Sequence, residues 1–314
     1  HGVSVSEYVD GGDRQWTYVA DSSFNRRITP MTPMQIMGPA AGSAMLATAY
    51  SANGTAGRGT INNCANGISG WGTNLTCEEN WAGYFRRDAS DVALRTEREL
   101  TALARYGVSV RTGNYAWSTV ASSDPMFTKW NATITGATAT DDYRNEPNQY
   151  GWVVEIDPYD PASTPRKRTA LGRCGHEGAF VRIAAGQKVG VYMGDDSRRE
   201  YLYKYVSNAT WDAGDANVSN RLAVGDKYLD NGTLYVAKFE ADGTGTWLPL
   251  VFGSVPNRPA VGTTPAYVFA DQADILINCR LAADAVGATP MDRPEWTAGN
   301  PVTGEIYLTL TNNN

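Results

Sequence analysis

The sequence predicts an all-β protein, a β-propeller with a few inserted or appended helices. From residue 150 onward, short alternating segments follow one another at steady spacing, with turn residues between them. Such a pattern is typical of a sandwich, a barrel or a propeller. An internal echo favours the propeller: Glu177 precedes a strand centred on Tyr192, and Glu295 precedes one centred on Tyr307. Both units run from a small-residue loop through a glutamate to a strand with a central tyrosine.

Length and charge narrow the class of protein. We expect the 314 residues to form a single propeller-type domain over residues 1–314, and an incomplete one. No run approaches ~18 apolar residues, so we expect no membrane span. The net charge of −6 disfavours a nucleic-acid partner, because such proteins usually carry a basic face. The first residue is His1, which indicates a processed protein or a fragment.

The supply of metal ligands is restricted. The only histidines are His1 and His176, too few for a histidine-rich zinc site. A metal would therefore be held by carboxylates, with a thiolate as a further candidate, which favours Ca²⁺ or ferric iron. The four cysteines form no C-x-x-C pair, and we expect buried free thiols, although three disulfide connectivities are open. They are Cys64, Cys77, Cys174 and Cys279.

In the first third of the chain, residues 1–28 read as a strand pair that turns at Gly11 and Gly12. Residues 40–49 are a short helix or a small-residue loop. Residues 60–67 are rich in Asn and Gly around Cys64, a composition suited to a tight loop lining a site. Residues 71–80 read as a strand ending in Glu78 and Glu79, of which only one can face inward on an extended chain.

Further along, residues 87–106 predict an amphipathic helix capped by Ser90 or Asp91 and followed by Gly107. Residues 119–148 predict a long loop or lid that shapes access to a site. Residues 268–286 predict one helix that stops at Gly287. The remaining strands are predicted at residues 151–158, 175–183, 188–196, 200–206, 232–239 and 245–250, with three tyrosines on one face of 200–206.

The stretch 291–296 and the strand at 304–310 carry the most suggestive chemistry. Arg293 has the planar fork that grips phosphate, and Glu295 supplies a hard oxygen ligand. At the axis of a propeller these residues would meet other acids and one thiol: Glu79, Glu177, Asp195 or Asp196, and Cys64. Converging carboxylates repel one another, so convergence implies a bound metal. The alternative is that each acid separately caps a turn or faces solvent.

These pieces resemble the PhoX-type bacterial alkaline phosphatases, a β-propeller family. The resemblance extends from residue 1 to the last few residues, in the family's order. It rests on the runs HGVSVSEY, GPAAG, NNCANG, WGTNLTCEEN, GWVVEIDPYDPASTPRKRTALGR, GHEGAF, VYMGDD, EYLYKYVS, GATPMDRPEW and GEIYLTLTNN.

The resemblance implies a periplasmic or secreted phosphomonoesterase, a monomer, whose cofactor combines Fe³⁺ and Ca²⁺ acting as Lewis acids on the phosphoryl oxygens. It implies that Arg293 grips the substrate phosphate. The metal ligands that it implies are Cys64, Glu79 (with Glu78 as the fallback), Glu177, Asp196 and Glu295. Family members are longer at both ends, where they carry further ligands.

Two alternatives belong to other functional classes. One is a calcium-dependent hydrolase of the phosphotriesterase or lactonase kind, which needs acids and Asn but no cysteine ligand. The other is a non-catalytic propeller used for binding, which the 17 tyrosines and 9 tryptophans would suit. Metal content and the role of Cys64 separate these alternatives from a phosphatase.

Overall fold

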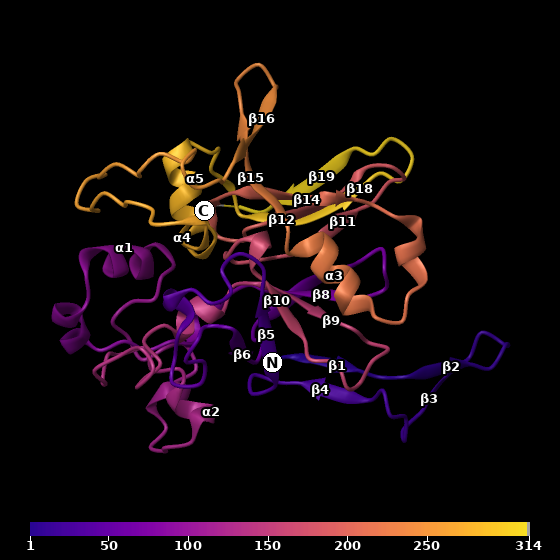
Figure 1. The fold of residues 1–314 in the computed structure, drawn as a ribbon, viewed down its shortest axis with the longest axis horizontal. Helices are drawn as coiled ribbons and strands as arrows, with labels where there is room; N and C mark the ends of the chain where they lie inside the picture. The colour runs from indigo at the N-terminus through magenta and orange to yellow at the C-terminus, as the bar shows by residue number, and fades with distance from the viewer. Residues whose placement is uncertain (313–314) are drawn as a thin grey trace.

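A computed structural model describes residues 1–312 as two larger β-sheets with helices beside and between them (Figure 1). The first sheet has six strands, in the order β6 (Ala56–Arg58), β5 (Pro33–Met37), β10 (Arg166–Arg168), β9 (Val153–Ile156), β8 (Asn74–Glu78) and β7 (Asn63–Ile68). The second has five, in the order β11 (Phe180–Arg182), β12 (Lys188–Gly194), β14 (Leu202–Thr210), β15 (Gly232–Phe239) and β16 (Gly245–Pro249). Within these sheets, β5 and β10 run parallel and the other neighbours run antiparallel.

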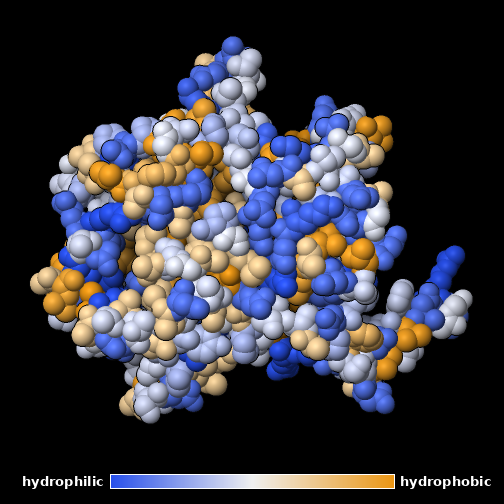
Figure 2. Space-filling model, in the orientation of Figure 1, coloured by the Kyte–Doolittle hydropathy of each residue, from blue (hydrophilic) through white to orange (hydrophobic). Residues whose placement is uncertain are grey.

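Smaller strand pairs complete the β-structure. They are β1 (Val3–Val5) with β4 (Arg26–Ile28), β2 (Tyr8–Asp10) with β3 (Trp16–Tyr18), β13 (Arg198–Glu200) with β17 (Met291–Asp292), and β18 (Pro294–Gly299) with β19 (Ile306–Leu310). The hairpin of β2 and β3 confirms the predicted turn near Gly11, and it projects from the body of the molecule (Figures 1 and 2). The all-β class with few helices is confirmed. No sheet within residues 1–312 closes on itself, and the propeller stays a prediction.

The main core lies between the second sheet and the helices beside it. The rings of Tyr203 and Tyr205 are fully buried and Tyr201 is nearly so, which confirms the predicted tyrosine face. They pack in one cluster with Val191 of β12 and Leu281 of α5 (Cys279–Val286). A second cluster, rich in aromatic rings, lies under the segment that follows β8. Burial of these large aromatic rings removes much apolar surface from water and is the main contribution that stabilises the fold.

The predicted helix at 87–106 is too long. Helix α1 spans Glu97–Arg105, and Thr96 caps it in a capping box with Glu99. Asp91 is not the cap. It is fully buried in a 3₁₀ turn and accepts a hydrogen bond at 2.7 Å from Arg95 Nε. Asp91 also accepts a hydrogen bond from Ile134 N, so a contact distant in sequence holds this 3₁₀ turn. Gly107 follows the end of the helix as predicted, with φ 75°.

The predicted helix at 268–286 is divided in two. Helices α4 (Gln272–Ile277) and α5 meet at Asn278, whose backbone leaves helical geometry. The amide of Asn278 donates to Asp274 Oδ1 and to Tyr267 Oη, and these buried contacts hold its side chain at the junction. Gly287 ends α5 in the left-handed region, as predicted.

Three further segments differ in detail. Residues 40–49 form a loop with one 3₁₀ turn, Ala44–Leu46, so the loop alternative is right. Most of 60–67 is strand β7, not a tight loop, because Asn62 (φ 47°) makes the turn just before it. Residues 119–148 are largely loop, with α2 (Pro125–Thr128) inside, but the fully buried Trp130 pins this segment to the aromatic cluster.

Helix α3 (Arg221–Leu229) packs between the two larger sheets and contacts β14 and β9. Asn220 caps it, with its side chain accepting from Ala223 N. None of the helices within residues 1–312 combines the length and the apolar character that a membrane span requires.

Candidate metal centre

The candidate centre forms where β7, the end of β8, the turn before β11, the end of β12 and β18 meet. Two glycines let these backbones approach closely. A Cβ on Gly67 would lie 1.8 Å from Ala179 O, and one on Gly194 would lie 2.1 Å from Glu295 O. Any larger residue there would push the strands apart. The glycines therefore bring the acid-bearing segments together.

Backbone hydrogen bonds hold these segments in register. Glu177 N donates to Gly194 O at 3.1 Å, and Ala65 N donates to Glu177 O at 2.9 Å. On the other side, Asp196 N donates to Gly175 O at 2.9 Å. Three segments far apart in sequence are thus fixed relative to one another by main-chain bonds rather than by flexible side chains.

Two groups of ligand-type side chains result, and Glu177 belongs to both. Cys64, Glu79 and Glu177 form the first group, and Glu177, Asp196 and Glu295 form the second. Within each group the ligand atoms lie within 4.8 Å of one another. Cys64 Sγ lies 3.2 Å from Glu177 Oε1. The structure therefore brings together all five residues that the sequence singled out as metal ligands.

The electrostatics of the centre favour a cation. Burial and the charge of Glu177 raise the pKa of Glu79 to about 7. Burial, with Glu295 and Asp196 nearby, also raises the pKa of Glu177. The Cys64 thiol is exposed and not buried as expected, while the other three cysteines are buried. Partial desolvation and the bond to Glu177 still raise the pKa of the Cys64 thiol to about 12. Asp196 Oδ1 is buried and has no hydrogen-bond partner among residues 1–312. A positive ion would relieve every one of these penalties.

Arg293 borders the second group. Its Nη2 lies 2.8 Å from Asp196 Oδ2 and 3.9 Å from Glu295 Oε1, while its side chain is 38% exposed. The backbone of Arg293 adopts φ 52°, an unusual value for a residue with a side chain. This bend, followed by Pro294, turns the guanidinium toward the acids while leaving donors free for a ligand.

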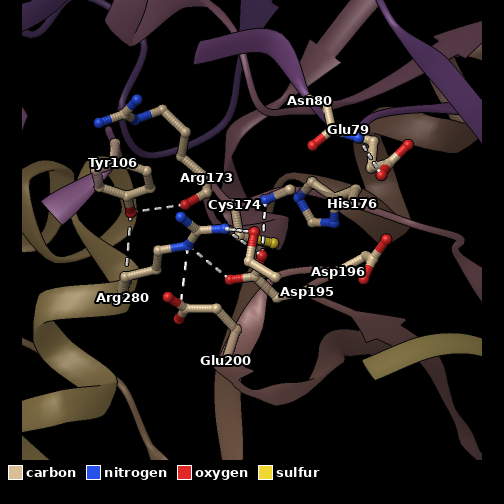
Figure 3. Close-up of polar contacts among 12 residues, drawn as sticks. Glu79, Asn80, Tyr106, Arg173, Cys174, His176, Asp195, Asp196, Glu200 and Arg280 are labelled. Atoms are coloured by element: carbon tan, nitrogen blue, oxygen red, sulfur yellow. Dashed lines mark hydrogen bonds and ion pairs between the residues drawn. The ribbon is translucent and has the colours of Figure 1, made fainter. Parts of the chain in front are cut away.

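The sequence did not decide between Glu78 and Glu79, or between Asp195 and Asp196, as members of the candidate centre. In the structure the two members of each pair lie in different surroundings. Glu78 is fully buried, pairs with Lys167 Nζ at 2.8 Å, and so lies in the core, whereas Glu79 lies in the candidate centre. Asp195 is also fully buried and pairs with Arg280 Nε at 2.8 Å. In Figure 3, Asp195 points toward Arg280 and Asp196 points away from it.

Two residues of the centre were missed by the sequence reasoning. Asn80 Nδ2 donates to Glu79 Oε1 and orients that carboxylate. Asn62 Oδ1 accepts from Asn80 N at 3.2 Å, and Asn62 O accepts from Glu79 N at 3.1 Å. The sequence feature that could have identified them is the presence of asparagines beside Cys64 and beside the Glu78–Glu79 pair.

Comparison with known proteins gives two findings. Residues 1–314 match the family model described as alkaline phosphatase PhoX. A solved structure of Pseudomonas fluorescens PhoX, in complex with vanadate, a transition state analogue, is similar at 42% sequence identity and a TM-score of 0.81. The similarity covers 99% of this chain and 50% of that chain, so this chain spans about half its length. No curated protein matched.

Proposed function

This chain belongs to the PhoX alkaline phosphatase family, and on that premise we propose that it hydrolyses small phosphate monoesters and releases inorganic phosphate. The observation that carries the proposal is the pair of ligand groups that share Glu177, with Arg293 beside one of them. The vanadate complex of the similar Pseudomonas fluorescens protein supports phosphoryl transfer as the reaction class.

For the cofactor we propose Fe³⁺ with Ca²⁺. The group of Cys64, Glu79 and Glu177 offers a thiolate and two carboxylates, a donor set that suits iron. The group of Glu177, Asp196 and Glu295 offers only oxygen, which suits calcium. The unpartnered Asp196 Oδ1 and the raised pKa of Glu79 fit a cation site. When bound, such ions supply Lewis-acid charge at the phosphoryl oxygens and activate a water nucleophile.

Arg293 is the residue that binds the phosphate in this proposal. One of its donors faces Asp196 Oδ2, and its partial exposure leaves others available to phosphoryl oxygens. In the transition state negative charge spreads over the equatorial oxygens, so a guanidinium stabilises that state more than the bound ester. Asp196 and Glu295 hold the guanidinium in place, and the rigid turn at Pro294 limits its movement.

We also propose that the chain has the propeller architecture of the family, is a monomer, and is periplasmic or secreted. The family match over residues 1–314 and the repeated Glu-to-Tyr units at Glu177 and Glu295 support the propeller.

The Cys64→Ser variant tests the proposal, because iron needs the thiolate and calcium does not. We expect it to lose iron and to lower turnover of p-nitrophenyl phosphate at least about 100-fold. Cys77→Ala is the control: that thiol is fully buried in the main core and outside the ligand groups, so iron should remain. A Cys64→Ser protein that keeps its activity with calcium alone would indicate the calcium-dependent hydrolase instead.

A further inference from the structure

A cavity of about 240 Å³ adjoins the candidate centre and shares Glu79 with it. We infer that this cavity receives the alcohol part of the substrate, and that Arg111 selects alcohols that carry a negative charge. The inference rests on the proposed function. The polar walls that matter are Glu79, Asn80, Arg111, Asn114, Ser197 and Arg280. Figure 3 shows Asn80 and Glu79 on one side of this region and Arg280 on another.

The positive charge of Arg111 is not neutralised by any carboxylate among the residues that the structure describes. Arg280 is neutralised by Asp195, with Nε to Oδ2 at 2.8 Å, and Glu200 lies 3.6 Å from the same nitrogen. Glu79 is engaged in the candidate centre. No carboxylate within residues 1–312 pairs with Arg111, although the chain as a whole is acidic. A free guanidinium over a polar cavity is suited to a carboxylate or a second phosphate.

The backbone fixes where Arg111 sits. Residues Arg87 and Arg111 form an antiparallel bridge, and Arg111 O accepts from Arg87 N at 3.4 Å. Arg87 is in turn buried and pairs with the fully buried Asp91 at 3.3 Å. Arg111 is itself exposed, on a segment that these contacts anchor to the core, which is the arrangement expected of a recognition residue.

The neutral walls of the cavity fit a small hydroxylated or aromatic group. Asn114 lies against Gly83, where a Cβ would come within 2.2 Å of Asn114 Nδ2, so glycine makes room for the amide. Asn114 N also donates to Gly83 O at 2.5 Å. Ser197 Oγ lies 3.4 Å from Arg280 Nη2. Small-molecule pockets usually run from about 300 Å³ upward, so this cavity suits a small alcohol better than a nucleoside.

The test compares two esters that differ in charge: phenyl phosphate and 4-carboxyphenyl phosphate. The readout is the ratio of their kcat/KM values, measured on the metal-loaded full chain. We expect wild-type protein to prefer the carboxylate, and Arg111→Gln to lower the ratio about tenfold, mainly through KM. Arg111→Lys should retain part of the preference, and added salt should reduce it in the wild type. Arg27→Gln, on strand β4, is the control and should keep the wild-type ratio.

The outcomes separate this inference from the proposed function. An unchanged ratio in Arg111→Gln, with both esters still hydrolysed, would overturn the role of Arg111 and leave the phosphatase proposal standing. Absence of turnover of both esters by metal-loaded wild-type protein would overturn the phosphatase proposal and this inference with it.

Discussion

Arg293 combines an unfavourable backbone conformation with a place beside the candidate centre. Its φ of 52° lies in the left-handed region, where a residue with a side chain is destabilised by roughly 1 kcal/mol or more. The following Pro294 favours extended backbone at Arg293 and does not relieve this cost, so the ion pair with Asp196 is the contact that holds the side chain in place. Strain at such a position is common where a side chain must be aimed at a ligand.

Replacing Arg293 by Ala should lower kcat/KM for p-nitrophenyl phosphate by about 10²–10³-fold, since one charge-stabilising group for the transition state is lost. Metal content should be unchanged, because Arg293 is not a ligand in the proposed centre. Arg293→Lys restores the charge but not the planar fork and should recover only part of the rate. Activity of Arg293→Ala within twofold of wild type would contradict a role in phosphate binding.

The sequence indicated the residues of the candidate centre but could not choose between Glu78 and Glu79, or between Asp195 and Asp196. Alternation along a strand shows that only one member of each pair faces the site. The choice depends on distant partners: Lys167 lies 89 residues from Glu78, and Arg280 lies 85 residues from Asp195. Those ion pairs draw Glu78 and Asp195 into the core. Nothing local to either pair encodes this.

At the scale of elements, strands were predicted better than helices. The strands of the second sheet alternate clearly, because one face of each packs into the main core. Helix boundaries failed where a buried polar side chain bonds to a group outside the helix: Asp91 accepts from Ile134 N, and Asn278 donates to Tyr267 Oη. Residues 60–67 were predicted as a tight loop, but most of them form strand β7, which pairs with the nearby β8. The close approach of Gly67 to Ala179, a contact across 112 residues, is not revealed by local composition.

Gly194 allows β18 to pack closely on β12, and its substitution tests that role. In Gly194→Ala the new Cβ would meet Glu295 O at 2.1 Å and Pro294 O at 2.7 Å, so β18 must shift. We expect a loss of about 1–3 kcal/mol in the free energy of unfolding and weaker calcium binding, because Glu295 moves with its strand. Calorimetry and calcium titration measure the two effects.

Gly190→Ala is the matched control on the same strand. The nearest atoms to a Cβ there are at 3.5 Å and 3.9 Å, which is ordinary contact. Its calcium affinity should equal that of the wild type. Equal calcium affinity in the two alanine variants would contradict the view that Gly194 positions Glu295.

The carboxylate of Asp142 helps to hold the segment of residues 119–148 in place. Its Oδ2 accepts from Thr135 N at 2.9 Å and Gly136 N at 3.0 Å, and Arg144 Nε donates to Oδ1 at 2.8 Å. Burial alone would raise the pKa of Asp142, but Arg144 and the backbone donors lower it to about 2. This stabilisation is present above the unfolded value of 3.8 and is lost as the pH falls through about 2.

Asp142→Asn should therefore lower the free energy of unfolding by about 1–2 kcal/mol at pH 6 and speed hydrogen exchange in residues 133–148. The difference from wild type should narrow as the pH falls from about 4 to 2. The neighbouring Asp141 is exposed, so Asp141→Asn is the control and should cost less. A difference that stays constant down to pH 2 would contradict this account.

At the scale of the molecule, the two larger sheets and the pair of β18 and β19 converge on the two ligand groups that share Glu177. The chain spans about half the length of the similar Pseudomonas fluorescens structure, while nearly all of it is covered by the match. Composition alone indicated that any metal would be held largely by carboxylates, because the chain has only two histidines. The arrangement of those ligands into two groups that share Glu177 required the fold.

The central claim is that these groups hold iron and calcium and that the ions serve phosphate ester hydrolysis. Elemental analysis of the purified protein, paired with turnover of p-nitrophenyl phosphate before and after chelation, tests it most directly. We predict that iron and calcium co-purify with the protein, and that removing them abolishes turnover and lowers the melting temperature. A purified protein that contains neither metal and hydrolyses no p-nitrophenyl phosphate would contradict the claim.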